Sequence, residues 1–474
     1  MRYAAVLLSS LIVSSLSAEI VSYQAPPEAK LNHSYTVSVS QNDGEWIEIP
    51  SYNVMVDRVA GTGHKVVNSS MAYFDMDSTT RVRVISNSRH VETARVRPAS
   101  RGIGCTVKAD TIYFNIDRPE LLSVEVNGDI FDNLQLFANP IDRNAPTPKQ
   151  LKKLRKNNNF IYFGAGYHKL DTLKVTSGQE VYIAGGALVD GVIEIENADG
   201  VRLHGRGMVY PYHKMGVAVR NSRNVTVEGV FTTQCAVGGS DSVKVDNVKV
   251  MSYYGWGDGF NVFASNNVRY NHIFARTSDD CTTIYATRKG FTGGCRNIIT
   301  EDAVLWADVA HPFMIGLHGN VENPDTIEDC IYRNIDVLDM QEKQIDYQGV
   351  FAIVAGDNNT VRRITFDDIR VDNFRQGKLF DIRIAWNKKY CGAPGMAIED
   401  ITFNNIVYNG DRSELSLIIG YDDTRKVNGI HFNNLVINGV KIYDKMPGKP
   451  GWYKTADMAR FYIGEHVENL TFSE

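Results

Sequence analysis

The sequence predicts an all-β protein in which a small N-terminal β-sandwich precedes a right-handed parallel β-helix. Residues 19–145 contain short segments of alternating apolar and polar residues separated by Gly, Pro, Asn and Asp, a pattern typical of half-buried antiparallel strands. Residues 155–474 contain a strand-like unit that recurs with almost no sustained helical periodicity. A chain of 474 residues is long enough to hold both parts.

The recurring unit combines alternating apolar positions, an aromatic residue and an Asn or Asp corner. Its clearest copies begin at Val361, Ile398, Val427 and Val467, and a weaker copy begins at Ile327. Copies and earlier echoes are spaced by roughly 24 to 40 residues, because loops of different length interrupt them. Coils of this kind stack so that strands of successive coils pair. A β-propeller is the competing architecture, but its blades keep a more uniform period and four strands each.

The two parts are joined by a proline-rich segment. Three prolines in Asn139–Pro148 indicate a stiff connector, followed by a short charged stretch. The predicted domains are therefore residues 19–145 and residues 155–474. The second of these is expected to be the catalytic domain.

The first 18 residues fit a cleaved secretory signal peptide. Arg2 is followed by an apolar run from Ala4 to Leu16 and by small residues at the end of the segment. A transmembrane anchor is the alternative, but the run is shorter than the roughly 20 residues that span a bilayer. We therefore expect a secreted or periplasmic protein without a membrane span. The formal net charge of −5 gives no basic surface for nucleic acid, so nucleic acid is not an expected partner.

Three aspartates recur at an interval of about one coil. Asp258 precedes Asp279 and Asp280 by 21 and 22 residues, so the two segments should lie side by side, roughly 4.8 Å apart along the helix axis. Crowded carboxyls raise one another's pKa, so one can act as an acid while another acts as a base. Trp256 offers a flat face for a sugar ring. The alternative is that these aspartates are corner residues that cap the backbone.

A geometric condition applies to the neighbouring pair. In a regular strand Asp279 and Asp280 would point to opposite faces of the sheet. Both can reach one site only if the backbone bends or bulges there.

At these residues the chain resembles the polygalacturonase-like glycoside hydrolases of family 28 and their relatives, the dextranases of family 49. The resemblance rests on Asp258, on Asp279-Asp280-Cys281 and on His311 followed by Ile315-Gly316. It implies that Asp279 is the general acid and that Asp258 and Asp280 hold and deprotonate the attacking water. The implied reaction is hydrolysis with inversion, with carboxyls about 6.5 to 9.5 Å apart.

The resemblance also implies roles for other residues. His311 would orient or tune Asp279 by hydrogen bonding. Cys295 would be the disulfide partner of Cys281, although two buried free thiols are the alternative for this exported chain. The N-terminal sandwich is similar to that of the dextranase group.

The chain departs from the polygalacturonase pattern at the next coil. Polygalacturonases carry an Arg-Ile-Lys segment there, whereas Gly349–Gly356 contains no cation, so galacturonan is in doubt as the substrate. Candidate substrate-binding residues besides Trp256 are His318, Lys343, Asp346, Arg383 and Trp386. Lys388 and Lys389 follow Trp386 closely in the sequence.

The sequence thus predicts a secreted glycoside hydrolase that cleaves a polysaccharide or oligosaccharide by inverting acid/base hydrolysis. No metal-ligand motif or phosphate loop stands out, and this chemistry needs no cofactor. One alternative is a β-helix polysaccharide lyase, which would use calcium and a basic residue. The other is a carbohydrate-binding β-helix without catalytic activity.

Overall fold

The computed structural model describes residues 19–474 except 62, 212–214 and 412, and it confirms the predicted fold class. The predicted signal peptide, residues 1–18, lies outside the described residues. Among the residues that are described, no helix has both the length and the apolar character needed to cross a bilayer. The predicted domain boundary between residues 145 and 155 stays a prediction.

Two mainly antiparallel sheets form the N-terminal sandwich, with an apolar core between them. The first contains β1 (Ile20–Val21), β4 (Tyr52–Ala60), β5 (Gly63–Met76), β7 (Ala94–Arg97), β10 (Glu120–Val126) and β11 (Asp129–Pro140). The second contains β2 (Tyr35–Ser40), β3 (Ile47–Ile49), β6 (Thr80–Ser86), β8 (Thr106–Lys108) and β9 (Thr111–Ile116). The described residues also form short helices, among them η1 (Ala99–Arg101), α1 (Pro148–Leu154) and α2 (Thr455–Met458).

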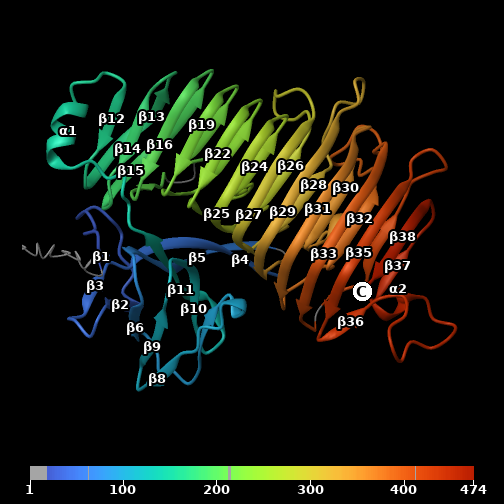
Figure 1. The fold of residues 1–474 in the computed structure, drawn as a ribbon, viewed down its shortest axis with the longest axis horizontal. Coiled ribbons are helices and arrows are strands. Elements are labelled where there is room, and N and C mark those ends of the chain that lie inside the picture. Colours follow the sequence, from blue (N-terminus) through green and yellow to red (C-terminus); the bar gives the residue numbers. More distant parts are fainter. Residues whose placement is uncertain (1–18, 62, 212–214, 412) are drawn as a thin grey trace, which may run out of the picture.

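The β-helix is one continuous sheet in the described chain, in which nearly all neighbouring coils pair in parallel (Figure 1). Its first strands are β12 (Phe160–Phe163), β13 (Gly166–Val175), β14 (Glu180–Ile183), β15 (Ala187–Glu196), β16 (Asp199–Gly205), β17 (Met208–Val209), β18 (Val217–Arg220), β19 (Arg223–Glu228), β20 (Phe231–Thr232), β21 (Cys235–Gly238), β22 (Asp241–Asp246) and β23 (Lys249–Met251).

The middle and last coils follow in the same order along the axis. They contain β24 (Phe260–Phe263), β25 (Asn266–Thr277), β26 (Thr282–Tyr285), β27 (Cys295–Ala307), β28 (Phe313–Gly316), β29 (Thr326–Asp339), η2 (Ile345–Tyr347), β30 (Phe351–Ala355), β31 (Thr360–Asp372), β32 (Phe380–Ile384), β33 (Ala397–Asn409), β34 (Ser416–Ile419), β35 (Val427–Ile437), β36 (Val440–Ile442), β37 (Phe461–Ile463) and β38 (Val467–Ser473).

The repeated aromatic residue of each unit stacks on its equivalent one coil away. The ring centroids of Tyr332, Phe366, Phe403, Phe432 and Phe472 follow one another at 5.0, 5.1, 4.9 and 5.0 Å, and the rings are nearly parallel. These rings lie in the core of the β-helix, where their burial and stacking both stabilise the array. The sequence repeat therefore corresponds to one coil of the structure.

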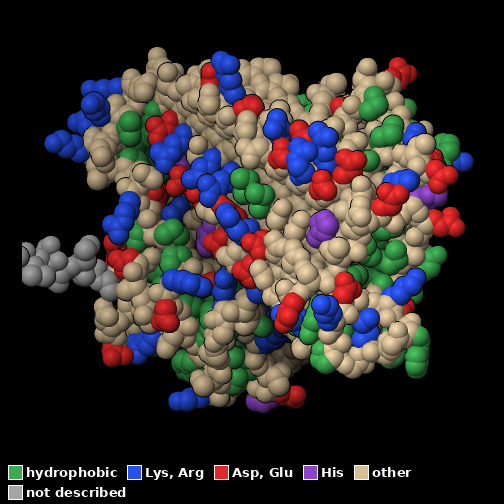
Figure 2. Space-filling view, turned by 45° about the vertical axis from the view of Figure 1, so that its right-hand side comes forward, with side chains coloured by type: hydrophobic (Ala, Val, Ile, Leu, Met, Phe, Trp, Pro, Cys, Tyr) green, Lys and Arg blue, Asp and Glu red, His purple; other side chains and the backbone are tan. Residues whose placement is uncertain are grey.

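The first sheet of the sandwich lies between two apolar cores. One face packs on the second sheet, and the other packs on the β-helix through residues such as Tyr52, Phe137, Phe274 and Trp306. The β4–β5 hairpin runs below the coils toward the middle of the β-helix (Figure 1), and β4 contacts β23 and β25. On the surface, basic and acidic side chains are interspersed over the face drawn in Figure 2.

Candidate active site

Parallel pairing aligns the predicted site residues on three successive coils. The first residues of β24, β26 and β28 are in register. Asp258, Asp280 and His311 each stand two positions before the first residue of their strand. Equivalent positions in neighbouring parallel strands are about 4.8 Å apart. The one-coil spacing predicted from the sequence is therefore confirmed.

Asp279 and Asp280 occupy a bend, as the sequence required for both to reach one site. Strand β25 ends at Thr277 and β26 begins at Thr282, so neither aspartate lies in a regular strand. Hydrogen bonds stabilise the bend: the Thr277 hydroxyl donates to the Asp279 carbonyl at 2.7 Å, and the Asp280 amide donates to Asp279 Oδ1 at 3.0 Å.

The glycines on both sides of Asp258 permit the close approach of the next coil. A Cβ added at Gly257 would lie 2.3 Å from Ser278 Oγ, and one added at Gly259 would lie 2.6 Å from the Cys281 carbonyl oxygen. Any other residue at Gly259 would displace the backbone of one coil from the next. The Gly-Asp-Gly sequence thus holds Asp258 against the neighbouring corner.

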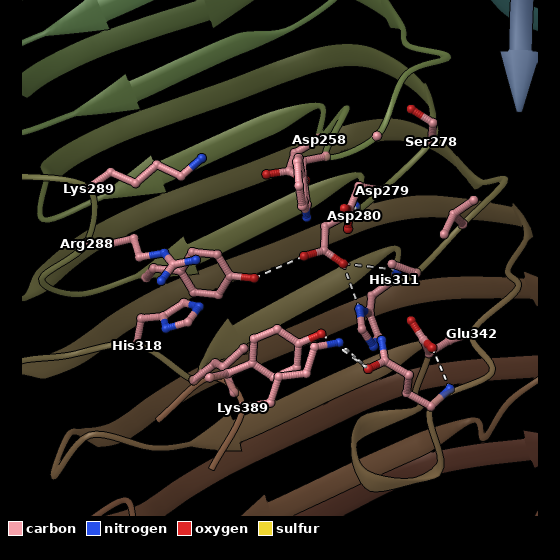
Figure 3. A pocket seen from close by; sticks show the side chains of 18 of the residues that line it. Asp258, Ser278, Asp279, Asp280, Arg288, Lys289, His311, His318, Glu342 and Lys389 are labelled. Carbon is pink, nitrogen blue, oxygen red and sulfur yellow. Dashed lines mark hydrogen bonds and ion pairs between the residues drawn. The ribbon is translucent and has the colours of Figure 1, made fainter. Parts of the chain in front are cut away.

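The three carboxyl groups form one compact cluster (Figure 3). Each of Asp258, Asp279 and Asp280 contributes an oxygen, and these oxygens lie within 4.8 Å of one another. These are single oxygens of the three groups, which lie at the same corner of adjacent coils. Oxygens this close could also hold a hard cation such as Ca²⁺ or Mg²⁺.

His311 is hydrogen-bonded to Asp280, whereas the sequence analysis assigned Asp279 as its partner. His311 Nδ1 lies 2.6 Å from Asp280 Oδ1, and its backbone amide donates to the same oxygen at 3.2 Å. The register explains the difference, because Asp280 rather than Asp279 is the residue aligned with His311. The Tyr285 hydroxyl donates to the other oxygen of Asp280 at 3.0 Å. Asp280 is thus held as an acceptor of several hydrogen bonds.

Two members of the cluster have strongly raised pKa values. Burial, and then the charge of Asp280, raise the pKa of Asp258 to about 7, while a hydrogen bond from Asn261 at 2.6 Å acts in the opposite direction. Burial, followed by the charges of Asp258 and Asp280, raises the pKa of Asp279 well above its ordinary value. A proton can therefore be retained within the cluster near neutral pH.

The cluster lines a cavity of about 400 Å³. Arg288 and Lys289 lie on one side of the carboxyls, and Glu342 lies on the other (Figure 3). A second cavity of about 320 Å³, lined largely by apolar residues such as Phe291, shares Trp256, Asp258, Phe263 and Lys289 with the first. The carboxyls therefore lie where two adjoining cavities meet.

Trp256 and His318 lie at this site as predicted. Trp256 lines both cavities and is 84% exposed, with a φ of 59° that is unusual for a bulky residue. His318 is buried against Tyr285, with ring centroids 4.9 Å apart. Burial, and then the charges of Arg288 and Lys289, lower the pKa of His318 to about 3, so the imidazole is neutral at neutral pH.

Four other predicted substrate-binding residues lie outside the lining of the cavity. Lys343 is exposed and contacts the Gly61 carbonyl of the β4–β5 hairpin. Arg383 is bonded to buried Asp381, with Nε 2.6 Å from Oδ1. Asp346 and Trp386 are at the surface, and Trp386 is 44% exposed. The Lys388 Nζ atom lies over the indole of Trp386, 4.9 Å from the ring centroid. Contact of these residues with a longer substrate stays a prediction.

The expected disulfide between Cys281 and Cys295 is not present, and both are buried free thiols. The Sγ of Cys281 lies 3.2 Å from the Thr277 hydroxyl, and that of Cys295 donates to the Tyr285 carbonyl at 3.2 Å. The two sulfur atoms therefore have separate hydrogen-bonding partners, and the alternative of free thiols is confirmed.

The fold brings to the cavity further residues that are not among those predicted from the sequence. Arg288 and Lys289 follow the Asp-Asp-Cys corner by a few residues, and this adjacency was a usable signal. Tyr285 is the last residue of β26, the strand that follows Asp280. His64 lines the same cavity from the N-terminal sandwich, and no local pattern indicated its position.

The fold and the site together place the protein among β-helix proteins that carry a cluster of acidic side chains in a surface cavity. Among solved structures, the chain is similar to Dex49A from Penicillium minioluteum, with a TM-score of 0.61 and 12% identity over 94% of this chain and 96% of that chain. Neither a protein-family model nor a curated protein matches the sequence.

Two further solved structures are similar at lower TM-scores. One is the family 28 exopolygalacturonase of Yersinia enterocolitica, with a TM-score of 0.48 and 12% identity over 83% of this chain and 96% of that chain. The other is the endo-xylogalacturonan hydrolase of Aspergillus tubingensis, with a TM-score of 0.40 and 16% identity over 61% and 87%. The likeness to Dex49A agrees with the resemblance drawn from the sequence. At 12% identity that likeness shows the fold alone.

Proposed function

We propose that the protein is a glycoside hydrolase that cleaves a polysaccharide or oligosaccharide outside the cell. The single observation that carries the proposal is the cluster of three carboxyls within 4.8 Å, two of which have raised pKa values. Hydrolysis of a glycosidic bond requires a protonated carboxyl and an ionised one in the same site. The predicted signal peptide supports export, and the solved structures of similar fold include enzymes named as hydrolases of polysaccharides.

Each carboxyl has a proposed role. Asp279 is the general acid that protonates the glycosidic oxygen, because its pKa is raised by burial and by both neighbouring charges. Asp258 and Asp280 hold the water that attacks the anomeric carbon and accept its proton. His311 and Tyr285 fix the orientation of Asp280. One water molecule is consumed for each bond that is cleaved.

The stereochemical course is proposed to be inversion, with the water held between Asp258 and Asp280. The close spacing of the carboxyl oxygens makes retention the competing course, since retaining pairs are about 5 to 5.5 Å apart. Proton NMR of the first product, recorded before mutarotation, distinguishes the two. A product with the anomeric configuration of the substrate would contradict inversion.

The substrate is proposed to carry an acidic group. Arg288, Lys289 and Lys389 line the cavity that contains the carboxyls. Arg288 and Lys289 form no ion pair with the other described residues, so their charges are available to an anionic ligand. These cations come from loops rather than from the coil that carries the Arg-Ile-Lys segment of polygalacturonases.

The experiment is a screen of neutral, uronate-containing and sulfated glycans with the wild type and with Asp279→Asn. We expect cleavage by the wild type and a rate about 10²–10⁴-fold lower for the variant, because the general acid is lost. Asp400→Asn, at an exposed corner of a later coil, is the matched control and should leave the rate unchanged. Equal activity of wild type and Asp279→Asn would contradict the proposed mechanism.

The same screen tests the acidic substrate and the lyase alternative. We expect Arg288→Gln with Lys289→Gln to raise KM for an anionic glycan about 10-fold, whereas Lys426→Gln, outside the cavity lining, should not. Equally efficient cleavage of neutral glycans would contradict the anionic preference. A product that absorbs ultraviolet light, together with loss of activity in a chelator, would identify a lyase instead.

A further inference from the structure

The N-terminal sandwich reaches the catalytic cavity through the β4–β5 hairpin. The outer part of this hairpin extends beyond the sheet: residues 63–66 of β5 are exposed, whereas residues 69–76 are buried. The hairpin lies against the β-helix through β23 and β25, and Tyr210 Oη lies 3.4 Å from the Met55 amide that donates to it. The hairpin is therefore held on the β-helix along its length.

The end of the hairpin is fixed beside the acidic cluster. The Lys343 ammonium donates to the Gly61 carbonyl, and Lys343 directly follows Glu342, which lines the cavity. His64 lines the same cavity, although it is far from the aspartates in the sequence. A blue strand from the N-terminal part of the chain enters the close-up of the site at the upper right (Figure 3).

The orientation of the His64 ring is fixed by a buried acid. His64 Nδ1 lies 2.8 Å from Oδ2 of Asp57, whose side chain is 4% exposed, while the His64 side chain is 57% exposed. The hydrogen bond leaves Nε2 as the ring nitrogen that can bind a ligand, and within the described chain no residue hydrogen-bonds to it. A surface imidazole held in this way is ready to bind a polar group in the cavity.

We propose that His64 is a substrate-binding residue, and that its Nε2 hydrogen-bonds a hydroxyl or acidic oxygen of the glycan unit bound in the cavity. The sandwich and the β-helix then form one substrate site. The inference rests on the proposed function, because it takes the ligand of the cavity to be a glycan. It goes further in assigning part of the binding to the N-terminal sandwich.

The test uses the full chain and two readouts, retardation of the protein in a gel that contains the glycan and steady-state kinetics. We expect His64→Ala to weaken retardation and to raise KM about 3- to 10-fold, with kcat changed less than 2-fold. His64→Gln retains a side-chain amide and should restore part of the binding. His90→Ala is the matched control, because His90 forms a similar pair with Asp110 at 2.7 Å but does not line the cavity.

The outcomes separate this inference from the proposed function. Unchanged retardation and KM in His64→Ala, with or without a lower Tm, would overturn the role of His64. A glycan that binds in a His64-dependent manner but is never cleaved would support the binding role and overturn the proposed hydrolysis. If no glycan in the screen retards the wild type, both proposals fail.

Discussion

At the scale of single residues, the chemistry of the site follows from the exclusion of water from crowded carboxyls. Asp258 and Asp279 are half-buried where they line the cavity, and burial is the largest cause of their raised pKa values. Asp280 differs because His311 and Tyr285 bond to both of its oxygens. These unequal surroundings are the basis for the different roles proposed for three identical side chains.

The raised pKa of Asp258 should also be measurable as a pH-dependent loss of stability. Its folded pKa of about 7 exceeds the ordinary value of 3.8, so the folded state binds this proton more tightly than the unfolded state does. The contribution of Asp258 to the free energy of unfolding is therefore greatest below about pH 4 and falls as the pH rises toward 7. Asp258→Asn removes this dependence.

At pH 4 we expect Asp258→Asn and the wild type to have the same free energy of unfolding. At pH 8 the free energy of unfolding of the variant should be higher by roughly 1–3 kcal/mol. Differential scanning calorimetry at the two pH values measures the difference. A variant that is equally destabilised at both values would contradict the assigned pKa.

At the scale of elements, the coil repeat determines which residues are aligned at the site. The stacked rings of Phe366, Phe403 and Phe432 keep successive coils in register, with centroids about 5 Å apart. Asn and Asp residues at the corners adopt positive φ, for example 54° at Asn405 and 60° at Asn434, which are joined by a 2.8 Å hydrogen bond. The same register aligns Asp258, Asp280 and His311.

Gly259→Ala tests this alignment. Its Cβ would lie 2.6 Å from the Cys281 carbonyl oxygen, so one coil must shift and Asp258 must move away from Asp280. We expect activity to fall about 10²-fold while the circular dichroism spectrum stays that of the wild type, because a displacement near 1 Å is costly in catalysis. Gly451→Ala is the control, since its added Cβ meets open space and it does not line the cavity. Equal activity of the two variants would show that the close approach is not required.

At the scale of the whole molecule, buried charges join the sandwich to the β-helix. Arg276, on the coil that carries the catalytic bend, is fully buried and bonded to Asp308 at 2.8 and 3.1 Å. It also donates to Asn133 and to the Ile130 carbonyl of the sandwich, and its guanidinium lies 4.1 Å from the ring centroid of Trp306. The position of the sandwich is therefore coupled to the coil beside the cavity.

We expect Arg276→Ala to lower the free energy of unfolding by about 3–5 kcal/mol, because it leaves Asp308 buried without its main partner. Arg223→Ala, which breaks the exposed pair with Asp199, should leave the free energy of unfolding nearly unchanged. Chemical denaturation of the three proteins measures the difference. Equal costs for the two substitutions would show that the buried pair is not needed to hold the two parts together.

The sequence by itself determined the coil repeat and the acidic cluster, because both depend on local periodicity: an apolar pattern that recurs, and aspartates one coil apart. Only the tertiary structure decided that His311 pairs with Asp280, that Cys281 and Cys295 stay separate, and that Arg288, Lys289 and His64 line the cavity. The physical reason is that these contacts depend on exact strand register, loop shape and the docking of a distant hairpin. The docked hairpin brings His64 to aspartates far away in the chain, and no local pattern encodes that contact.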